Sequence, residues 1–195
     1  MLESIVMEIL RNHIEQITPL NDGEFEYIKS FFTQKKVRKN QYLIQEGDDV
    51  RNEYLVLSGI YKVFYLDENG REYICMFAQK NWWMSDYKSF FNQLPAAMFL
   101  ECIVEGEVLC LSLHGREKLA ADMHKMEHFF RVKLTHGFVA LQQRIRLLLS
   151  NTPQQRYEQF AKLYPDLLQQ VPKKCIAEFI GVSRETLSRL HPREK

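Results

Sequence analysis

The spacing of apolar residues changes twice along this chain, and this change limits the folds that the chain can adopt. Near the N-terminus apolar residues recur every three or four positions, from about residue 41 they alternate with polar ones, and after residue 115 the three- and four-residue spacing returns. Side chains alternate between the two faces of a strand, whereas positions three and four apart share one face of a helix. The chain is therefore predicted to be an α+β protein with a β domain between two helical segments.

Two helices are predicted before the β region. Residues 2–17 carry apolar side chains at helical spacing. A second helix is expected to start at Asn21, because Asn21 and Glu24 have the spacing of a capping box. Its apolar face is expected to reach Phe32, and the helix to end before Lys35.

The alternating region contains a predicted hairpin. Ile60–Leu66 and Arg71–Ala78 are rich in β-forming residues and flank Asn69-Gly70. Asn-Gly tolerates the positive φ angles of a tight two-residue turn. With a second strand pair expected around Gly106, the region is predicted to be a compact β barrel or sandwich.

Composition places the chain among ordinary globular proteins. Of its 195 residues 46% are hydrophobic and 26% are charged, which excludes a disordered chain. The net charge of +1 excludes attraction of the whole molecule to nucleic acid or membrane, so any such binding must be local. No apolar run is long enough to span a membrane and no signal-like segment opens the chain, so a cytoplasmic protein without a membrane partner is expected.

A long helix is predicted after the β region, followed by a separate C-terminal domain. Five apolar residues of this helix form a seam typical of helix pairing: Leu134, Phe138, Leu141, Ile145 and Leu148. Dimerisation is favoured over packing of the seam on the chain's own β domain. Thr152, Pro153 and Gln155 then have the spacing of a capping box that starts a new helix. The predicted parts are residues 1–115 (sensor), 116–151 (connecting helix) and 152–195, and the last part, from residue 153, has a net charge of +3.

Residues 173–190 have the pattern of a DNA-reading helix-turn-helix. Ala177 is a small residue where two helices would approach, Gly181 suits the turn, and apolar residues on both sides can fix the helices to a core. The alternative is a small helical hairpin with a solvated charged face. In the DNA-reading interpretation, the base-contacting face consists of Ser183 (also the helix cap), Arg184, Glu185, Ser188 and Arg189, and the phosphate contacts are Lys173, Lys174 and Arg193.

These residues also carry a resemblance to a known family. The segment Ile176–Arg189, with Ser183-Arg184-Glu185-Thr186 followed by Arg189, resembles the DNA-binding motif of the CRP/FNR transcription regulators. The glycines in Gln45–Asp48 and Leu55–Gly59 resemble the β-roll pattern of the same family. The resemblance implies a cyclic-nucleotide-binding-type β-roll, a dimerisation helix and a winged helix-turn-helix, with Arg184, Glu185 and Arg189 at base-contacting positions.

The chain departs from this family where cyclic AMP would bind. Members that bind cyclic AMP carry a Gly-Glu pair and an arginine for the cyclic phosphate. Here these positions read Trp82–Asp86 and Leu94–Met98, without an arginine, so cyclic AMP is not expected to be the effector. Asp86 is a candidate for the ribose contact. The candidate effector pocket consists of Trp82, Trp83, Ser85, Asp86, Ala96 and Ala97, although paired tryptophans are more often core residues.

Other ligands of the family are also not expected. The four cysteines contain no C-x-x-C pair and none lies in the N-terminal region, so we expect buried thiols without an iron–sulfur cluster or disulfides. His124 and His128 have metal-ligand spacing, but solvated histidines are favoured. Pro192 is expected to stop the last helix, and the three residues that follow leave no chain for a β wing.

The sequence therefore predicts a homodimeric DNA-binding regulator rather than an enzyme. Its expected partners are double-stranded DNA, a second copy of the chain and an unidentified small-molecule effector, with RNA polymerase as a further candidate. The alternative is a cyclic-nucleotide-binding-like module that acts through protein contacts and has lost sequence-specific DNA binding.

Overall fold

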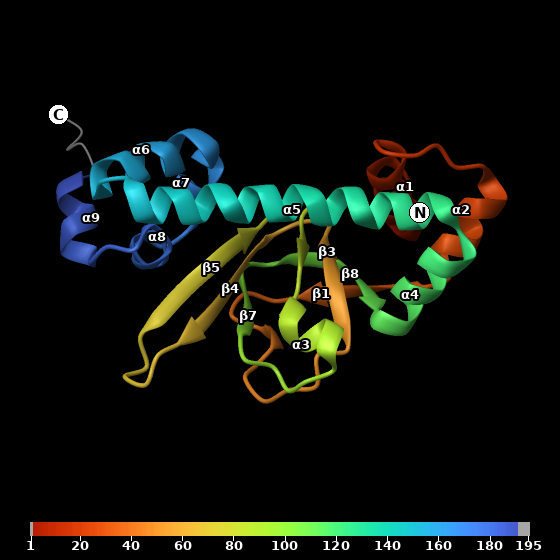
Figure 1. Cartoon of the computed structure of the whole chain (residues 1–195), viewed down its shortest axis with the longest axis horizontal. Coiled ribbons are helices and arrows are strands. Elements are labelled where there is room, and N and C mark those ends of the chain that lie inside the picture. Colours follow the sequence, from red (N-terminus) through yellow and green to blue (C-terminus); the bar gives the residue numbers. More distant parts are fainter. Residues whose placement is uncertain (1, 191–195) are drawn as a thin grey trace. The chain divides into compact units, whose positions relative to one another are not determined.

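The computed structural model describes residues 2–190, and the side chains of residues 5–190. Within that range helices precede a β region and further helices follow it, which confirms the α+β order (Figure 1). The helices up to the end of the β region are α1 (Leu2–Glu15), α2 (Asp22–Lys29) and α3 (Tyr87–Asn92). The later helices are α4 (Leu113–Asp122), α5 (His124–Ser150), α6 (Pro153–Leu163), α7 (Pro165–Gln170), α8 (Lys173–Ile180) and α9 (Arg184–Leu190).

The β region is a β-roll of two four-stranded sheets. One sheet has the order β1-β8-β3-β6 and the other β2-β7-β4-β5. The strands are β1 (Phe32–Val37), β2 (Tyr42–Ile44), β3 (Asn52–Val56), β4 (Ile60–Leu66), β5 (Glu72–Ala78), β6 (Trp83–Met84), β7 (Phe99–Val104) and β8 (Gly106–Ser112).

Strand β1 corrects the predicted start of the β region. The sequence places Phe32 on the second helix and strands only from about residue 41, but α2 ends at Lys29 and β1 pairs antiparallel with β8, with Phe32 opposite Leu111. Its four central residues are all exposed, so they show no alternation. The strand forms because β8 supplies hydrogen-bonding partners, which the apolar pattern does not reveal.

The β4–β5 hairpin is confirmed, but its turn is longer than expected. The N–H of Asp67 donates to the carbonyl of Arg71 at 3.1 Å, which leaves Glu68–Gly70 as a three-residue loop. The Asp67 carboxylate accepts bonds of 2.9 Å from the N–H groups of Asn69 and Arg71. Gly70 has φ +74°, whereas Asn69 is not in the positive-φ region. The Asp67 side chain thus favours a loop in which one glycine is left-handed, in place of a two-residue turn.

Two helices, rather than the single helix expected over residues 116–151, follow the β-roll. The Ser112 hydroxyl caps α4 by accepting from the N–H of Gly115 at 3.0 Å. Met123 has an extended conformation between α4 and α5 and packs against the hydrophobic core. The break at Met123 allows Met126 and Phe129, near the start of α5, to enter the same core.

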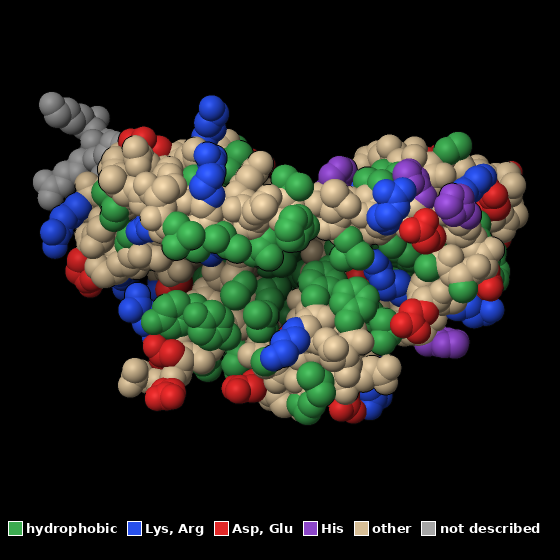
Figure 2. Space-filling model, in the orientation of Figure 1, with side chains coloured by type: hydrophobic (Ala, Val, Ile, Leu, Met, Phe, Trp, Pro, Cys, Tyr) green, Lys and Arg blue, Asp and Glu red, His purple; other side chains and the backbone are tan. Residues whose placement is uncertain are grey.

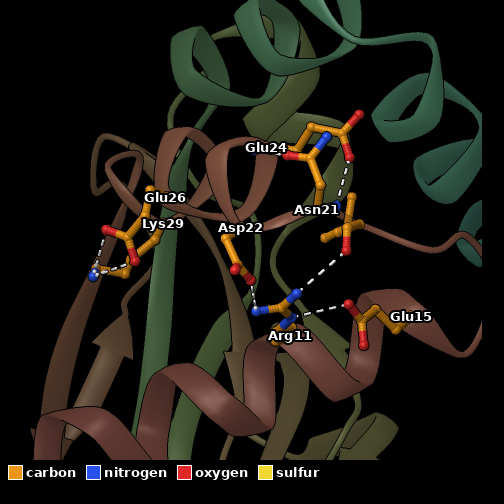
Figure 3. Close-up of polar contacts among 8 residues, drawn as sticks. Arg11, Glu15, Asn21, Asp22, Glu24, Glu26 and Lys29 are labelled. Atoms are coloured by element: carbon orange, nitrogen blue, oxygen red, sulfur yellow. Dashed lines mark hydrogen bonds and ion pairs between the residues drawn. The ribbon is translucent and has the colours of Figure 1, made fainter.

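The N-terminal helices cover the core and are joined by polar contacts (Figure 3). Arg11 on α1 bonds Glu15 at 2.9 Å, Asp22 at 2.7 Å and the carbonyl of Leu20 at 3.2 Å. The predicted capping box at Asn21 and Glu24 is confirmed by reciprocal bonds of 2.9 and 2.8 Å. These contacts lie within 11 residues of one another, so the sequence pattern is sufficient to find the cap.

The described chain divides into two compact units. One contains residues 2–63 and 77–136, and its core combines α1, α2, one face of the β-roll and the start of α5. The other contains residues 64–76, the outer part of the β4–β5 hairpin, together with residues 137–190. No helix in residues 2–190 is long and apolar enough to cross a membrane.

Candidate nucleic-acid interface

Residues 173–190 form two helices joined by a tight turn. Helix α8 ends at Ile180, and its C-cap Gly181 is left-handed with φ 72° and ψ 42°. The N–H of Val182 bonds the carbonyl of Ala177 at 3.0 Å. Added bulk at Gly181 would meet only a Leu148 methyl group at 3.7 Å, so the positive φ is the reason for glycine. The Ser183 hydroxyl accepts from the N–H of Thr186 at 3.2 Å and caps α9 as predicted.

The two faces of α9 differ in burial. Leu187 is buried, and helix α9 contacts α8, whose buried apolar side chains include Ile176 and Ile180. Val182 in the turn is also buried. The five side chains predicted to contact bases are all exposed: Ser183, Arg184, Glu185, Ser188 and Arg189. The Glu185 backbone N–H, followed by the Ser183 hydroxyl, lowers the pKa of the Glu185 carboxyl, which is therefore an acceptor at neutral pH. The fold thus presents guanidinium donors and a carboxylate acceptor on one solvent-facing surface.

The predicted phosphate contacts lie in different surroundings. Lys173 is exposed at the start of α8. The Lys174 Nζ lies 3.7 Å from a carboxylate oxygen of Glu72 on β5 and 3.5 Å from one of Glu178 on α8. Arg193 and Pro192, and with them the predicted wingless end, lie outside the described residues.

Two arginines that the sequence analysis missed hold the helix-turn-helix. Arg156 donates to the carbonyls of Leu148 at 3.2 Å and Gly181 at 3.5 Å. Arg144 donates to the carbonyls of Ile74 and Phe179. The sequence offers no signal for these roles, because all four acceptors are backbone atoms and three of them lie 25 or more residues from their arginine.

The predicted dimer seam lies on α5 and is exposed. Its members Leu134, Phe138, Leu141, Ile145 and Leu148 have 39–64% of their surface exposed. Figure 2 shows hydrophobic side chains on the C-terminal half of this helix. An exposed apolar stripe of this kind is typical of an interface.

The candidate effector residues do not share one environment in the structure. Trp83 donates from Nε1 to His13 Nε2 at 3.1 Å, and its ring contacts Phe32, Phe129 and Phe130. Trp82 is half-buried. Trp83 is therefore positioned by the core of its own unit.

Asp86 joins the two segments that the sequence analysis assigned to the pocket. Its carboxylate is buried, caps α3 and accepts from the backbone N–H groups of Ala97 at 2.8 Å and Met98 at 3.1 Å. Ser85 is also buried, and its hydroxyl donates to the carbonyl of Asn52. Ala96 is buried and Ala97 exposed. The Asp86 carboxylate is thus engaged within the protein and is not directed to a ribose contact.

A surface hollow of about 350 Å³ lies elsewhere in the same unit. Phe91, Phe130 and Leu134 contribute apolar walls, and none of the six candidate effector residues lines it. The Arg116 guanidinium lies 4.1 Å from the ring centroid of Phe130 and pairs with the buried Glu53. Desolvation by burial raises the pKa of Glu53, and the charge of Arg116 opposes this effect.

The metal-ligating residue types are dispersed within the described part of the chain. No group of three or more His, Cys, Asp or Glu side chains there is arranged to hold a metal ion. His124 lies 3.7 Å from Glu127 and His128 contacts Arg131, both on their own helix. All four cysteines are thiols, with Cys75 partly exposed and Cys102, Cys110 and Cys175 buried.

Comparison with known proteins identifies similarity over most of the chain. Residues 34–123 match the cyclic nucleotide-binding domain family. The anaerobic regulatory protein of Bacillus subtilis is 25% identical over 125 residues, which are 64% of this chain and 52% of that protein. The match thus spans about half the length of this relative.

Solved structures share the fold at low identity. The global regulator CLP of Xanthomonas campestris, described as responsive to c-di-GMP, superposes with a TM-score of 0.68 at 15% identity, covering 87% of this chain and 89% of CLP. FixK2 of Bradyrhizobium japonicum superposes with a TM-score of 0.69 at 17% identity, covering 82% of each chain. A protein of Eubacterium rectale described as a CRP/FNR-family transcriptional regulator gives a TM-score of 0.70 at 15% identity, covering 88% of this chain and 82% of that one.

Proposed function

Because this chain contains a cyclic nucleotide-binding family domain and has the fold of CRP/FNR regulators, we propose that it is a DNA-binding transcription regulator. It acts as a homodimer, reads a near-palindromic operator and responds to an effector other than cyclic AMP. The relatives described above as regulators support the general role. The proposed DNA contacts, the dimer and the exclusion of cyclic AMP are argued from the side chains of this chain.

One observation carries the proposal, namely the charged face of α9 opposite its buried side. Arg184 and Arg189 can each donate two hydrogen bonds to guanine, and Glu185 can accept from the cytosine amino group. All three side chains are exposed, while Leu187 anchors the helix from behind. This arrangement suits insertion of α9 into the major groove.

The exposed stripe on α5 supplies the dimer contact. Five large apolar side chains at alternating three- and four-residue steps match the seam of a two-helix coiled coil. A two-fold pair of helix-turn-helix units would read half-sites about 34 Å apart, one turn of DNA. The operator is therefore expected to be a near-palindrome.

Cyclic AMP is a poor fit to the segments that would bind it. Residues 94–98 contain no arginine, and the Asp86 carboxylate already accepts from the Ala97 and Met98 N–H groups. A cyclic phosphate placed there would meet a carboxylate instead of a guanidinium, and burying it unpaired would cost several kcal/mol. Cyclic AMP up to millimolar concentration should leave the melting temperature unchanged, whereas a rise at micromolar nucleotide would contradict this part of the proposal.

Selection from a random pool of duplex DNA tests DNA reading. The wild-type protein should enrich a near-palindromic sequence, and fluorescence anisotropy then gives its Kd. Arg184→Ala and Arg189→Ala should each weaken binding by about 1–3 kcal/mol and relax the preference at one base position. Arg38→Ala removes an exposed arginine of the β-roll unit and should bind as the wild type does.

Two outcomes would contradict the proposal. In the first, the pool yields no preferred sequence, which would favour the protein-interaction alternative. In the second, both α9 variants bind the selected duplex as tightly as Arg38→Ala, which would show that another surface reads the DNA.

A further inference from the structure

Arg144 on α5 lies between the β4–β5 hairpin and the helix-turn-helix, within one compact unit. Its Nη2 donates to the carbonyl of Ile74 on β5 at 2.7 Å and to the carbonyl of Phe179 on α8 at 3.0 Å. The guanidinium carbon lies 3.6 Å from the centroid of the Phe179 ring. One side chain therefore contacts the hairpin, the α8 backbone and an α8 side chain.

The carbonyl of Phe179 needs a partner from outside its helix. Phe179 is the last residue but one of α8, where backbone carbonyls have no N–H one turn ahead inside the helix. The C-terminal end of a helix also carries partial negative charge, which a cation stabilises. A planar guanidinium can bond carbonyls with its edge while its face stacks on an aromatic ring.

Burial does not remove the charge of Arg144. Desolvation lowers the pKa of the Arg144 guanidinium to about 10, so the group remains protonated at neutral pH. Its charge is therefore held among backbone carbonyls and an aromatic ring. These contacts are harder to exchange for water than those of an exposed arginine.

A second contact joins the same elements. The Lys174 Nζ on α8 lies between Glu72 on β5 and Glu178 on α8. Lys174 is more than half exposed, so this ion pair is weak compared with the contacts of Arg144. Arg144 is therefore the stronger link between β5 and α8.

We propose that Arg144 is a positioning residue for DNA reading, which holds the end of α8 against β5 and so sets the direction in which α9 leaves the turn. The inference rests on the proposed function. Phe179 precedes the left-handed Gly181 by two residues and the α9 cap Ser183 by four. A shift at Phe179 is thus transmitted through a short, hydrogen-bonded turn to Arg184, Glu185 and Arg189.

The proposal predicts a specific loss in DNA binding. Base contacts require α9 at one angle in the groove, whereas phosphate attraction tolerates small rotations. Loss of Arg144 should therefore weaken binding to the selected operator while binding to unrelated duplex DNA is kept. The ratio of the two affinities should fall about tenfold or more.

Arg144→Met tests this, because Met keeps an apolar stem and removes the donors. Arg144→Lys retains the charge but not the guanidinium plane, so it should restore the ratio in part. Arg146→Met removes an exposed arginine from the adjacent part of α5 and serves as the matched control. Each variant is titrated with both duplexes at one salt concentration, after thermal unfolding has established the folded fraction.

Hydrogen exchange of the free protein provides a readout without DNA. Amides of residues 181–184, including that of Val182, should exchange about tenfold faster in Arg144→Met than in Arg146→Met. If the wild type selects no sequence, the proposed function fails, and the exchange rates still decide whether Arg144 holds the turn. An unchanged affinity ratio in Arg144→Met would overturn the inference. The inference would also be overturned if Arg144→Met lost affinity for both duplexes in proportion to its loss of folded protein. Unchanged amide exchange at residues 181–184 would overturn it as well.

Discussion

The Asp86 carboxylate accepts a 2.8 Å hydrogen bond from the backbone N–H of Ala97. The same oxygen accepts from the N–H of Met98 at 3.1 Å and the hydroxyl of Ser89 at 3.0 Å, while the other oxygen accepts from the N–H of Ser89. A buried carboxylate with four donors holds the segment after α3 in place. Asp86 is therefore part of the framework of the β-roll.

Asp86→Ala should destabilise the protein strongly. The change leaves the buried N–H and hydroxyl of Ser89 and two partly buried N–H groups without this acceptor, which should lower the free energy of unfolding by about 3 kcal/mol. Asp86→Asn keeps one acceptor oxygen, so its free energy of unfolding should fall less than that of Asp86→Ala. Urea unfolding measures both, and Asp48→Ala, which removes an exposed carboxylate that accepts from the N–H of Gln45, is the control. If Asp86→Ala is no less stable than this control, the assigned role is wrong.

Leu141→Glu should prevent dimerisation. Leu141 lies in the middle of the exposed stripe on α5, and a carboxylate there would face its symmetry mate across an apolar seam. Sedimentation equilibrium should show a dimer for the wild type and a monomer for the variant. Gln143→Glu places the same charge on the opposite side of α5 and should remain a dimer. A dimeric Leu141→Glu protein would place the interface elsewhere.

Arg116 and Glu53 should show strong coupling in a double-mutant cycle. Both side chains are nearly fully buried, so Arg116→Met leaves a buried acid without its partner and should cost about 3–5 kcal/mol. The double variant Glu53→Gln/Arg116→Met should be more stable than Arg116→Met alone. The exposed pair Lys118 and Asp122 provides the comparison, since Lys118→Met should have little effect. Additive losses at Glu53 and Arg116 would exclude the coupling.

His13 should make stability depend on pH. Its ring is buried, its Nε2 accepts from Trp83, and burial, followed by the charge of Lys133, lowers its pKa from 6.5 to about 4. Between pH 6.5 and about pH 4 the unfolded chain binds a proton at His13 that the folded protein does not bind. The contribution of His13 to the free energy of unfolding is therefore fully present above pH 6.5 and is lost as the pH falls to about 4. The full effect is about 3 kcal/mol.

Comparison of two variants isolates this contribution from the carboxyl groups that also titrate. Chemical denaturation from pH 7 to pH 4 should show a smaller loss of stability for His13→Gln than for the wild type. His114→Gln changes an exposed histidine and should follow the wild type. If the wild type and His13→Gln lose the same free energy of unfolding, His13 takes up a proton as easily in the folded protein as in the unfolded chain.

Short-range features of this protein are determined by the sequence. The caps at Asn21 and Thr152 and the left-handed Gly181 all lie where the residue pattern places them. Each depends on groups within about one helical turn, so the interacting atoms are close whatever the rest of the chain does. The hairpin and the position of the apolar stripe on α5 are equally local, because they follow from the spacing of apolar residues.

Only the tertiary structure decided which distant groups meet. Trp83 bonds His13 and Arg144 bonds Ile74, and each pair is separated by 70 positions in the chain. The same holds for β1, whose polar middle becomes a strand because β8 lies beside it. Such contacts depend on how the intervening elements pack, and neither periodicity nor local spacing contains that information. For this reason the helix-turn-helix could be found from the sequence, whereas the arginine that holds it to the hairpin could not.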